Sequence, residues 1–127
     1  MRRGELWTVA GGAYASKPRP ALIVQDDLFE GTASVTVAPL TTTLVDAPLL
    51  RVRVAADDLT GLQHDSQVMI DKVTTVRREN VGTRVGRLAP ESLVEVERAL
   101  MAFLGLVSPL LDLLIRHPVI TCHEESV

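Results

Sequence analysis

Short runs of β-branched or alternating apolar residues recur along the chain up to residue 76. Turn-forming pieces such as Gly11-Gly12, Asp26-Asp27 and Asp57-Asp58 separate them. Short runs with period-two alternation are typical of half-buried strands. The sequence therefore predicts a small antiparallel sheet that closes toward a barrel, with strands at Glu5–Val9, Pro20–Gln25, Ser34–Leu40, Leu49–Val54, Gln67–Ile70 and Val73–Val76.

The run near residue 50 alternates between apolar and basic residues, and it reads Leu50-Arg51-Val52-Arg53-Val54. Successive side chains on a strand point to opposite faces of the sheet, so Arg51 and Arg53 are expected on one face and the apolar residues on the other. One face of this strand is therefore predicted to be in contact with solvent.

A helical pattern replaces the strand pattern near Pro90. Proline is favoured at the first helical position, and Glu91 and Glu95 lie in the early turns, where the helix dipole favours acids. Gly105 can end this helix. Apolar residues at three- and four-residue steps predict a stripe that faces the core, made of Leu93, Val96, Leu100, Phe103 and Leu104.

A second, shorter helical signal follows the first helix. Ser108-Pro109 is a helix-start signal, residues 110–115 are densely apolar, and Pro118 closes the segment before a polar end. Together with the strands, these patterns predict an α+β fold that is mostly β, with a C-terminal helix and an extra short helical extension. We expect residues 1–107 to form the barrel and its helix, and residues 108–127 to form an extension of the same domain.

Composition favours one domain in a cytoplasmic setting. The chain has 127 residues and an apolar content of 46%, which is enough for one core. The single cysteine, Cys122, permits no disulfide within the monomer, which suits a reducing compartment. No stretch has the length of a signal sequence or a membrane span. Cys122 and His123 are adjacent candidate ligands without companions, so no metal and no other cofactor is predicted.

The formal net charge of −3 hides an asymmetry along the chain. Residues 1–87 hold 11 of the 13 Lys and Arg and 10 of the 16 Asp and Glu, whereas residues 88–127 hold 2 and 6. The acidic excess therefore lies in the C-terminal part. The near-neutral remainder can still bind a polyanion if its arginines gather in a groove, so net charge neither favours nor excludes RNA binding.

Four blocks of the sequence carry a resemblance to a known family. They read RGELW, KPRPALIVQ, APLTTT and SQVMIDKVTTV, and they begin at Arg3, Lys17, Ala38 and Ser66. In order and spacing they are similar to the successive blocks of the MazF/PemK toxin family, from about residue 3 to about residue 106. Each block alone is a weak pattern, but four blocks in register are fairly specific.

This resemblance implies a fold, an activity and partners. The fold would be an SH3-like barrel of the CcdB/MazF type that forms a homodimer, with single-stranded RNA in a groove at the subunit interface. The activity would be sequence-specific cleavage of mRNA without a metal, in which a ribose 2′-hydroxyl attacks its own phosphate to leave a 2′,3′-cyclic phosphate and a 5′-hydroxyl. A cognate, MazE-like antitoxin with an acidic C-terminal segment would silence the toxin.

The catalytic pair of the family falls on Arg19 and Thr41, the arginine of the Arg-Pro element and the first threonine after the proline-containing strand. Attack by a 2′-hydroxyl builds negative charge on the non-bridging phosphate oxygens, and a planar guanidinium offers paired donors that match them. Pro20 restricts Arg19 toward extended geometry, and Thr41 adds a neutral donor. Because arginine makes a poor base, electrostatic stabilisation is the role predicted for Arg19.

Further residues are expected to contact the RNA. Ser66 and Gln67 begin the block that lies near the groove in the family. His64 precedes them in a predicted loop, where a lone histidine is most often only exposed to solvent. Basic residues can position phosphates, although any one of them is more often a surface charge. The RNA-binding candidates are Lys17, Gln25, Thr42, His64, Ser66, Gln67 and Arg77.

The chain departs from the family at Val73-Thr74-Thr75, where many members have Ile-Arg-Thr. A basic residue that is often found there is missing, so the substrate preference is expected to differ. The loop of residues 10–17 is rich in Gly and Ala and lacks the Ser-Glu of many relatives. The cleavage sequence is therefore not predicted.

Two alternatives come from other functional classes. The same fold serves CcdB-like toxins, which bind gyrase and catalyse nothing, and fold alone cannot separate the two. Those toxins are expected to end in Trp-Gly-Ile, whereas this chain ends in Glu124-Glu125-Ser126-Val127, which favours the nuclease. The other alternative is an SH3-like adaptor that binds RNA or protein without activity and whose binding would survive loss of Arg19.

Overall fold

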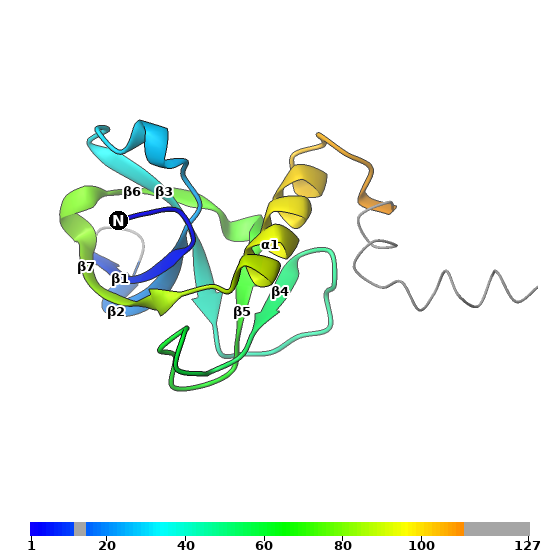
Figure 1. Ribbon diagram of the computed structural model, residues 1–127, viewed down its shortest axis with the longest axis horizontal. Coiled ribbons are helices and arrows are strands. Elements are labelled where there is room, and N and C mark those ends of the chain that lie inside the picture. Colours follow the sequence, from blue (N-terminus) through cyan, green and yellow to red (C-terminus); the bar gives the residue numbers. More distant parts are fainter. Residues whose placement is uncertain (12–14, 111–127) are drawn as a thin grey trace, which may run out of the picture.

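The computed structural model describes residues 1–11 and 15–110, in which seven antiparallel strands, one α-helix and three short 3-10 helices form a mostly-β α+β fold, as predicted (Figure 1). The sheet order is β4-β5-β3-β2-β1-β7, and β6 pairs with β3. The strands are β1 (Glu5–Gly11), β2 (Ala15–Ile23), β3 (Ser34–Thr41), β4 (Arg51–Val54), β5 (Ser66–Met69), β6 (Thr74–Arg77) and β7 (Val81–Arg87). The helices are η1 (Asp27–Phe29), η2 (Ile70–Lys72), η3 (Arg78–Asn80) and α1 (Pro90–Phe103).

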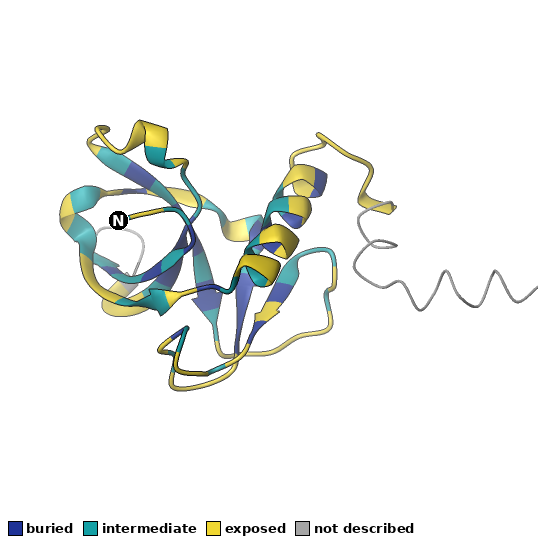
Figure 2. Cartoon of the chain, viewed as in Figure 1, coloured by how far each residue is buried: buried dark blue, intermediate teal, exposed yellow. Residues whose placement is uncertain are grey.

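The sheet buries apolar residues on both of its faces. Neighbouring residues of β2 and β3 join different core clusters, because successive strand residues point to opposite faces. The first cluster lies between the sheet and α1 and includes Leu22, Leu40, Val68 and Val96 (Figure 2). The second cluster is built from β1, β2, β3 and β6, and its buried residues are Val9, Ala21, Ile23, Val35, Val37 and Val76.

Strand β4 has the predicted alternation. Val52 and Val54 are buried in the first cluster, whereas Arg53 is exposed. Arg51 forms an ion pair with Asp71 of η2. The arginine face of the strand is therefore only partly in contact with solvent.

Strand β7 is absent from the sequence prediction, because two glycines interrupt its alternating pattern. It pairs along β1, with Arg87 opposite Glu5. A Cβ at Gly86 would lie 2.2 Å from the Thr60 carbonyl oxygen. The backbone at Thr60 can approach the strand this closely only because Gly86 has no side chain, so this glycine marks a close backbone approach and not a turn.

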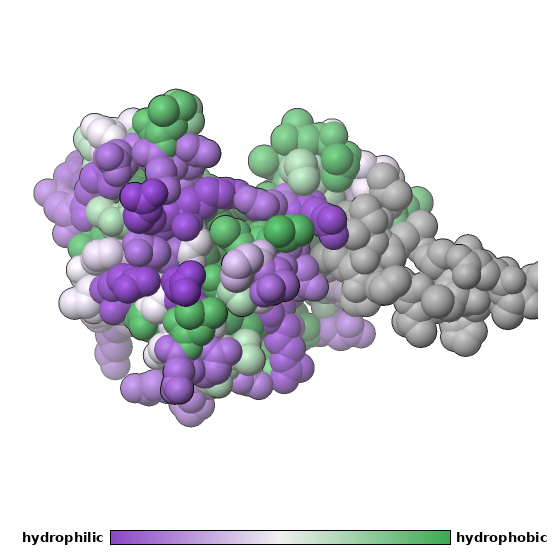
Figure 3. Space-filling view, viewed as in Figure 1, coloured by the Kyte–Doolittle hydropathy of each residue, from purple (hydrophilic) through white to green (hydrophobic). Residues whose placement is uncertain are grey.

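Helix α1 packs on the first cluster through only part of the predicted stripe. Leu93 and Leu100 are partly buried against the cluster, as expected. The prediction is wrong for Phe103 and Leu104, which are 48% and 65% exposed, because the last turn extends beyond β4 and η2, the elements on which α1 packs. Exposed apolar side chains therefore gather at the C-terminal end of the helix (Figure 3). The buried positions of the helix are Val96, Ala99 and Ala102.

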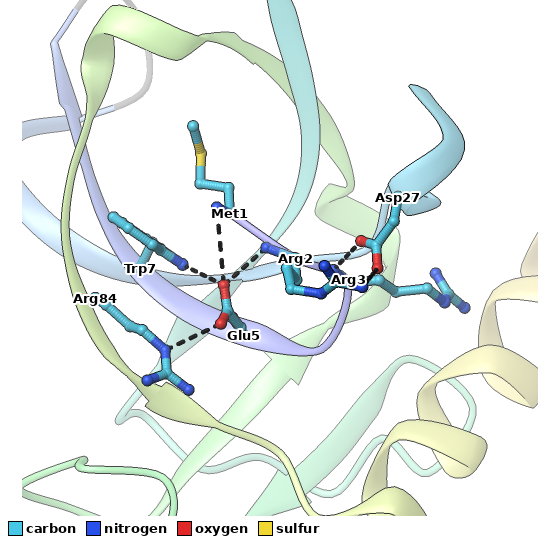
Figure 4. Close-up of polar contacts among 7 residues, drawn as sticks. All are labelled: Met1, Arg2, Arg3, Glu5, Trp7, Asp27 and Arg84. Carbon is cyan, nitrogen blue, oxygen red and sulfur yellow. Dashed lines mark hydrogen bonds and ion pairs between the residues drawn. The ribbon is translucent and has the colours of Figure 1, made fainter. Parts of the chain in front are cut away.

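A polar network at Glu5 joins the N-terminus, β1 and β7 (Figure 4). Glu5 Oε1 accepts hydrogen bonds from the Arg2 backbone N–H at 2.7 Å and from Trp7 Nε1–H at 3.0 Å. Glu5 Oε2 lies 3.1 Å from Nε of Arg84 on β7. Burial raises the pKa of Glu5, but the hydrogen bonds from Arg2 and Trp7 and the charge of Arg84 outweigh it and lower the pKa below its ordinary value.

None of the helices in residues 1–11 and 15–110 is long and apolar enough to span a membrane. Pro109 and Leu110 are helical, so the helix predicted after Ser108 begins within the described residues. Its continuation, the Cys122-His123 pair and the rest of the 108–127 extension lie outside the described residues and stay predictions.

Candidate active site

Strands β2 and β3 separate beside two prolines. Their pairing ends at Ala21 opposite Pro39. The Val24 N–H donates to the Thr36 carbonyl oxygen, and every second residue of β2 repeats this direction toward β3. Pro20 falls on this series but has no N–H, so the ladder lacks a donor at this point. Continued by two residues, the same register places Arg19 opposite Thr41.

A pocket of about 610 Å³ occupies the place where the strands separate, and both catalytic candidates, Arg19 and Thr41, line it. The volume is within the usual range for small-ligand sites, roughly 300–1,000 Å³. Of the RNA-binding candidates, Arg77 also lines the pocket. The remaining lining residues come from β1, β3, the segment from β5 to β6, and η3; they are Gly11, Pro39, Leu40, Met69, Lys72, Thr74, Thr75, Val76 and Asn80.

The two catalytic candidates continue the rows of the second core cluster. Odd-numbered residues of β2 and β3 point to one face of the sheet. Four of them, Ala21, Ile23, Val35 and Val37, are buried in the second cluster. Arg19 is the next odd-numbered residue before Ala21 on β2. On β3 the half-buried Pro39 and then Thr41 follow Val37. The strands that build the core therefore also fix where these two side chains start.

The hydroxyl of Thr41 is held in place from its own loop. Its Oγ1 accepts a hydrogen bond from the Thr43 backbone N–H at 3.1 Å. The Thr41 backbone pairs with Gln67 of β5. A hydroxyl has one hydrogen and two lone pairs, so Thr41 can still donate its hydrogen to a ligand in the pocket.

The pocket is lined by cations without acids. Arg19 is exposed, and its guanidinium makes no ion pair or hydrogen bond within the described part of the chain. Arg77 pairs with Glu79 at 3.2 Å, and Lys72 is the third cation. No Asp, Glu or His is among the described residues that line the pocket. Two of the three lining cations, Arg19 and Lys72, have no acidic partner among the described residues, and this favours an anionic ligand. A guanidinium can give two hydrogen bonds to one phosphate.

Some lining residues were not predicted from the sequence. Thr74 and Thr75 belong to the element where the chain departs from the family, and the structure places both in the lining of the pocket that also contains Arg19. Lys72 belongs to the same sequence block, but nothing in the local pattern indicates which way its side chain points. Asn80 lies in η3, outside all four family blocks.

Ser66 and Gln67 do not line the pocket of Arg19, and both form hydrogen bonds within the fold. Gln67 is buried; its Oε1 accepts from the Val45 backbone N–H at 3.1 Å and its Nε2 donates to the Val45 carbonyl oxygen at 2.9 Å. It therefore holds the loop that follows Thr41, beside a second pocket of about 490 Å³. Buried Ser66 donates to the carbonyl oxygen of His64 at 2.9 Å, and the His64 side chain is exposed.

The remaining candidates also lie outside the lining of the first pocket. Lys17 and Thr42 are exposed and close in sequence to the two catalytic candidates. The Gln25 side chain donates to the Phe29 carbonyl oxygen at 2.9 Å and accepts from the Thr36 backbone N–H at 3.1 Å. These bonds give Gln25 a structural task in the turn around η1.

Comparison with known proteins identifies the relatives of this chain. Residues 2–104 match the model of the PemK-like, MazF-like toxin of type II toxin-antitoxin systems. The chain is 57% identical over 107 residues to a protein named probable endoribonuclease MazF from Mycolicibacterium smegmatis. The aligned residues cover 84% of this chain and 98% of that protein. It is 31% identical over 118 residues to endoribonuclease MazF9 from Mycobacterium tuberculosis, covering 85% of this chain and 99% of that protein.

The fold has counterparts among solved structures. One, described as an endoribonuclease in complex with its cognate antitoxin from a mycobacterial species, superposes with a TM-score of 0.69 at 27% identity and covers 84% of this chain and 97% of that chain. The family model spans nearly all of the described residues, and a full-length relative shares more than half of the aligned positions. The chain therefore belongs to the PemK-like, MazF-like toxin family of type II toxin-antitoxin systems.

Proposed function

We propose that this toxin is a metal-independent endoribonuclease that cuts single-stranded mRNA in the pocket of Arg19 and Thr41. The observation that carries the proposal is the composition of that pocket: an unpaired guanidinium, a hydroxyl with a hydrogen to donate, and no carboxylate among the described lining residues. The names of the relatives at 57% and 31% identity support the same class of reaction.

The proposed reaction is a transesterification within the RNA. The ribose 2′-oxygen forms a bond to phosphorus, the bond from phosphorus to the 5′-oxygen breaks, and the products are a 2′,3′-cyclic phosphate and a 5′-hydroxyl. Arg19 donates two hydrogen bonds to the non-bridging oxygens as their charge grows, and Thr41 donates one. Polar side chains of Thr74, Thr75 and Asn80 offer hydrogen bonds to bases, which would make cleavage sequence-specific.

Partners follow from the same pocket. A cationic lining without acids suits an acidic antitoxin segment as well as RNA, so an antitoxin of the MazE type would act by occupying this pocket. We expect a homodimer, because the groove implied by the family resemblance spans two subunits, and the cytoplasm as the place of action, because mRNA is the substrate. Light scattering checks the dimer, and a monomer at working concentration would contradict it.

The test is incubation of the purified protein with a long RNA in EDTA, followed by mapping of the fragment ends. Arg19→Ala and Thr41→Val are compared with Arg98→Ala, which removes an exposed charge from α1, outside the pocket. We expect site-specific cuts with 5′-hydroxyl ends from the wild type and Arg98→Ala, and rates lower by about 10²–10³-fold in the two pocket variants.

Other results would contradict the proposal. Cleavage that survives in Arg19→Ala would exclude this pocket as the active site. No cleavage by the folded wild type would favour a CcdB-like gyrase-binding toxin or a binding adaptor. Thermal unfolding of each variant separates loss of activity from loss of fold.

A further inference from the structure

The short helix η2 sends its three side chains in three directions. A 3-10 helix has three residues per turn, so consecutive side chains diverge by about 120°. Ile70 is fully buried in the first core cluster, and Asp71 pairs with Arg51 of β4. These two contacts fix the rotation of η2 about its axis. The remaining direction belongs to Lys72, which lines the pocket of Arg19.

The ammonium group of Lys72 is uncommitted. Its side chain is exposed and makes no ion pair or hydrogen bond with the part of the chain that the structure describes. Arg77, by contrast, is paired with Glu79. Among the described residues that line the pocket, Lys72 is the one ionisable side chain other than the arginines.

Cleavage of RNA requires a proton at the departing 5′-oxygen. An arginine is effectively never deprotonated, and a threonine hydroxyl is neutral, so neither catalytic candidate is suited to give that proton. A lysine ammonium can give a proton and recover it from water, and a positioned acid of this kind is an ordinary component of such reactions.

We infer that Lys72 donates a proton to the 5′-oxygen as its bond to phosphorus breaks, an inference that rests on the ribonuclease function proposed above. The proton lost by the 2′-hydroxyl passes to solvent, and Lys72 regains one from solvent, so the enzyme is unchanged at the end of the turnover. Arg19 and Thr41 stabilise the charge on the non-bridging oxygens, and Lys72 acts on the bridging oxygen.

A sulfur substitution in the RNA tests this division of roles. Two oligonucleotides carry the cut site mapped on long RNA, and one has sulfur in place of the scissile 5′-bridging oxygen. A thiolate leaves without being protonated, so an acid is dispensable for that substrate. The wild type, Lys72→Ala, Lys72→Arg, Arg19→Ala and Arg98→Ala are compared on both substrates in single turnovers, after thermal unfolding has shown that each is folded.

We expect Lys72→Ala and Lys72→Arg to cut the oxygen substrate about 10²–10⁴-fold more slowly and the sulfur substrate at nearly the wild-type rate. Arg19→Ala should be slow on both substrates, since charge develops on the non-bridging oxygens in each, and Arg98→Ala should match the wild type.

Three results would overturn the inference. Equal slowing of Lys72→Ala on both substrates, or recovery of the oxygen substrate by Lys72→Arg, would make Lys72 a phosphate-binding charge. A wild-type rate for Lys72→Ala on the oxygen substrate would remove it from the reaction. Failure of the folded wild type to cut either RNA would refute the ribonuclease function itself and is therefore distinguishable from a failure at Lys72 alone.

Discussion

Arg19 and Thr41 each lie two residues beyond Ala21 and Pro39, the last pair of β2 with β3, and both line the pocket where the two strands separate. One strand thus contributes a guanidinium and the other a hydroxyl to the same pocket. Because the two groups start from different strands that are each anchored in the core, either side chain can be changed without moving the other.

Replacing Arg19 by lysine separates charge from geometry. Lysine keeps one positive charge but loses the planar pair of donors that matches two phosphate oxygens. We expect Arg19→Lys to cut RNA more slowly than the wild type by at least about tenfold, since one charge-assisted hydrogen bond contributes about 1.5–3 kcal/mol. Single-turnover cleavage rates check this. A rate equal to that of the wild type would mean that charge alone suffices at this position.

Much of the fold could be predicted from apolar periodicity. The predicted strands at residues 5–9, 34–40 and 67–70 fall on β1, β3 and β5, and the helix begins at Pro90, as expected. The apolar pattern does not predict β7, because Gly82 and Gly86 interrupt it. At both glycines a segment distant in sequence lies too close for a side chain, and such an approach leaves no local pattern. The exposure of Phe103 also leaves no local pattern, because it depends on how far the elements under α1 extend.

The candidate site was predictable only where a motif carries it. Arg19 and Thr41 stand in family blocks, and the family assignment is confirmed by the comparison with known proteins. Lys72 could not be found in this way, because its direction depends on the pairing of Arg51 with Asp71, two residues 20 positions apart. Gln67 also stands in a family block, yet only the structure shows its side chain bound to the loop at Val45.

The Gln67 amide offers a test of loop positioning. Gln67→Leu removes both hydrogen bonds to Val45 and leaves the groups of a part-buried backbone without these partners. We expect a loss of about 1–3 kcal/mol in the free energy of unfolding, together with slower RNA cleavage because the loop also positions Thr41. Urea unfolding and cleavage rates measure the two effects. Gln63→Leu, at an exposed position, is the matched control, and an equal loss in both variants would contradict the assignment.

The close approach at Gly86 predicts a steric effect on β7. A Cβ there would lie 2.2 Å from the Thr60 carbonyl oxygen, which is backbone and cannot move aside without moving the turn. Gly86→Ala should lower the free energy of unfolding by about 1–3 kcal/mol, as overpacking generally does. Gly31→Ala is the control, because a Cβ at Gly31 meets nothing within 4 Å. Similar midpoints of urea unfolding for both variants would show that the turn yields at no cost.

The lowered pKa of Glu5 predicts a stability that depends on pH. A carboxylate whose pKa is depressed in the folded state stabilises the fold above its ordinary pKa, and this contribution is lost as the pH falls through the folded-state value.

Glu5→Gln keeps an oxygen acceptor for Arg2 and Trp7 but removes the attraction to Arg84. We therefore expect it to cost about 1 kcal/mol at pH 7 and progressively less as the pH falls below the ordinary pKa of 4.5 and through the lower folded-state pKa, where the wild-type carboxylate becomes protonated. Urea unfolding across this range measures the difference, and Glu30→Gln, at an exposed position, should follow the wild type throughout. A deficit in Glu5→Gln that stays constant with pH would mean that shape and hydrogen bonding, and not the charge of Glu5, tie the N-terminus to β7.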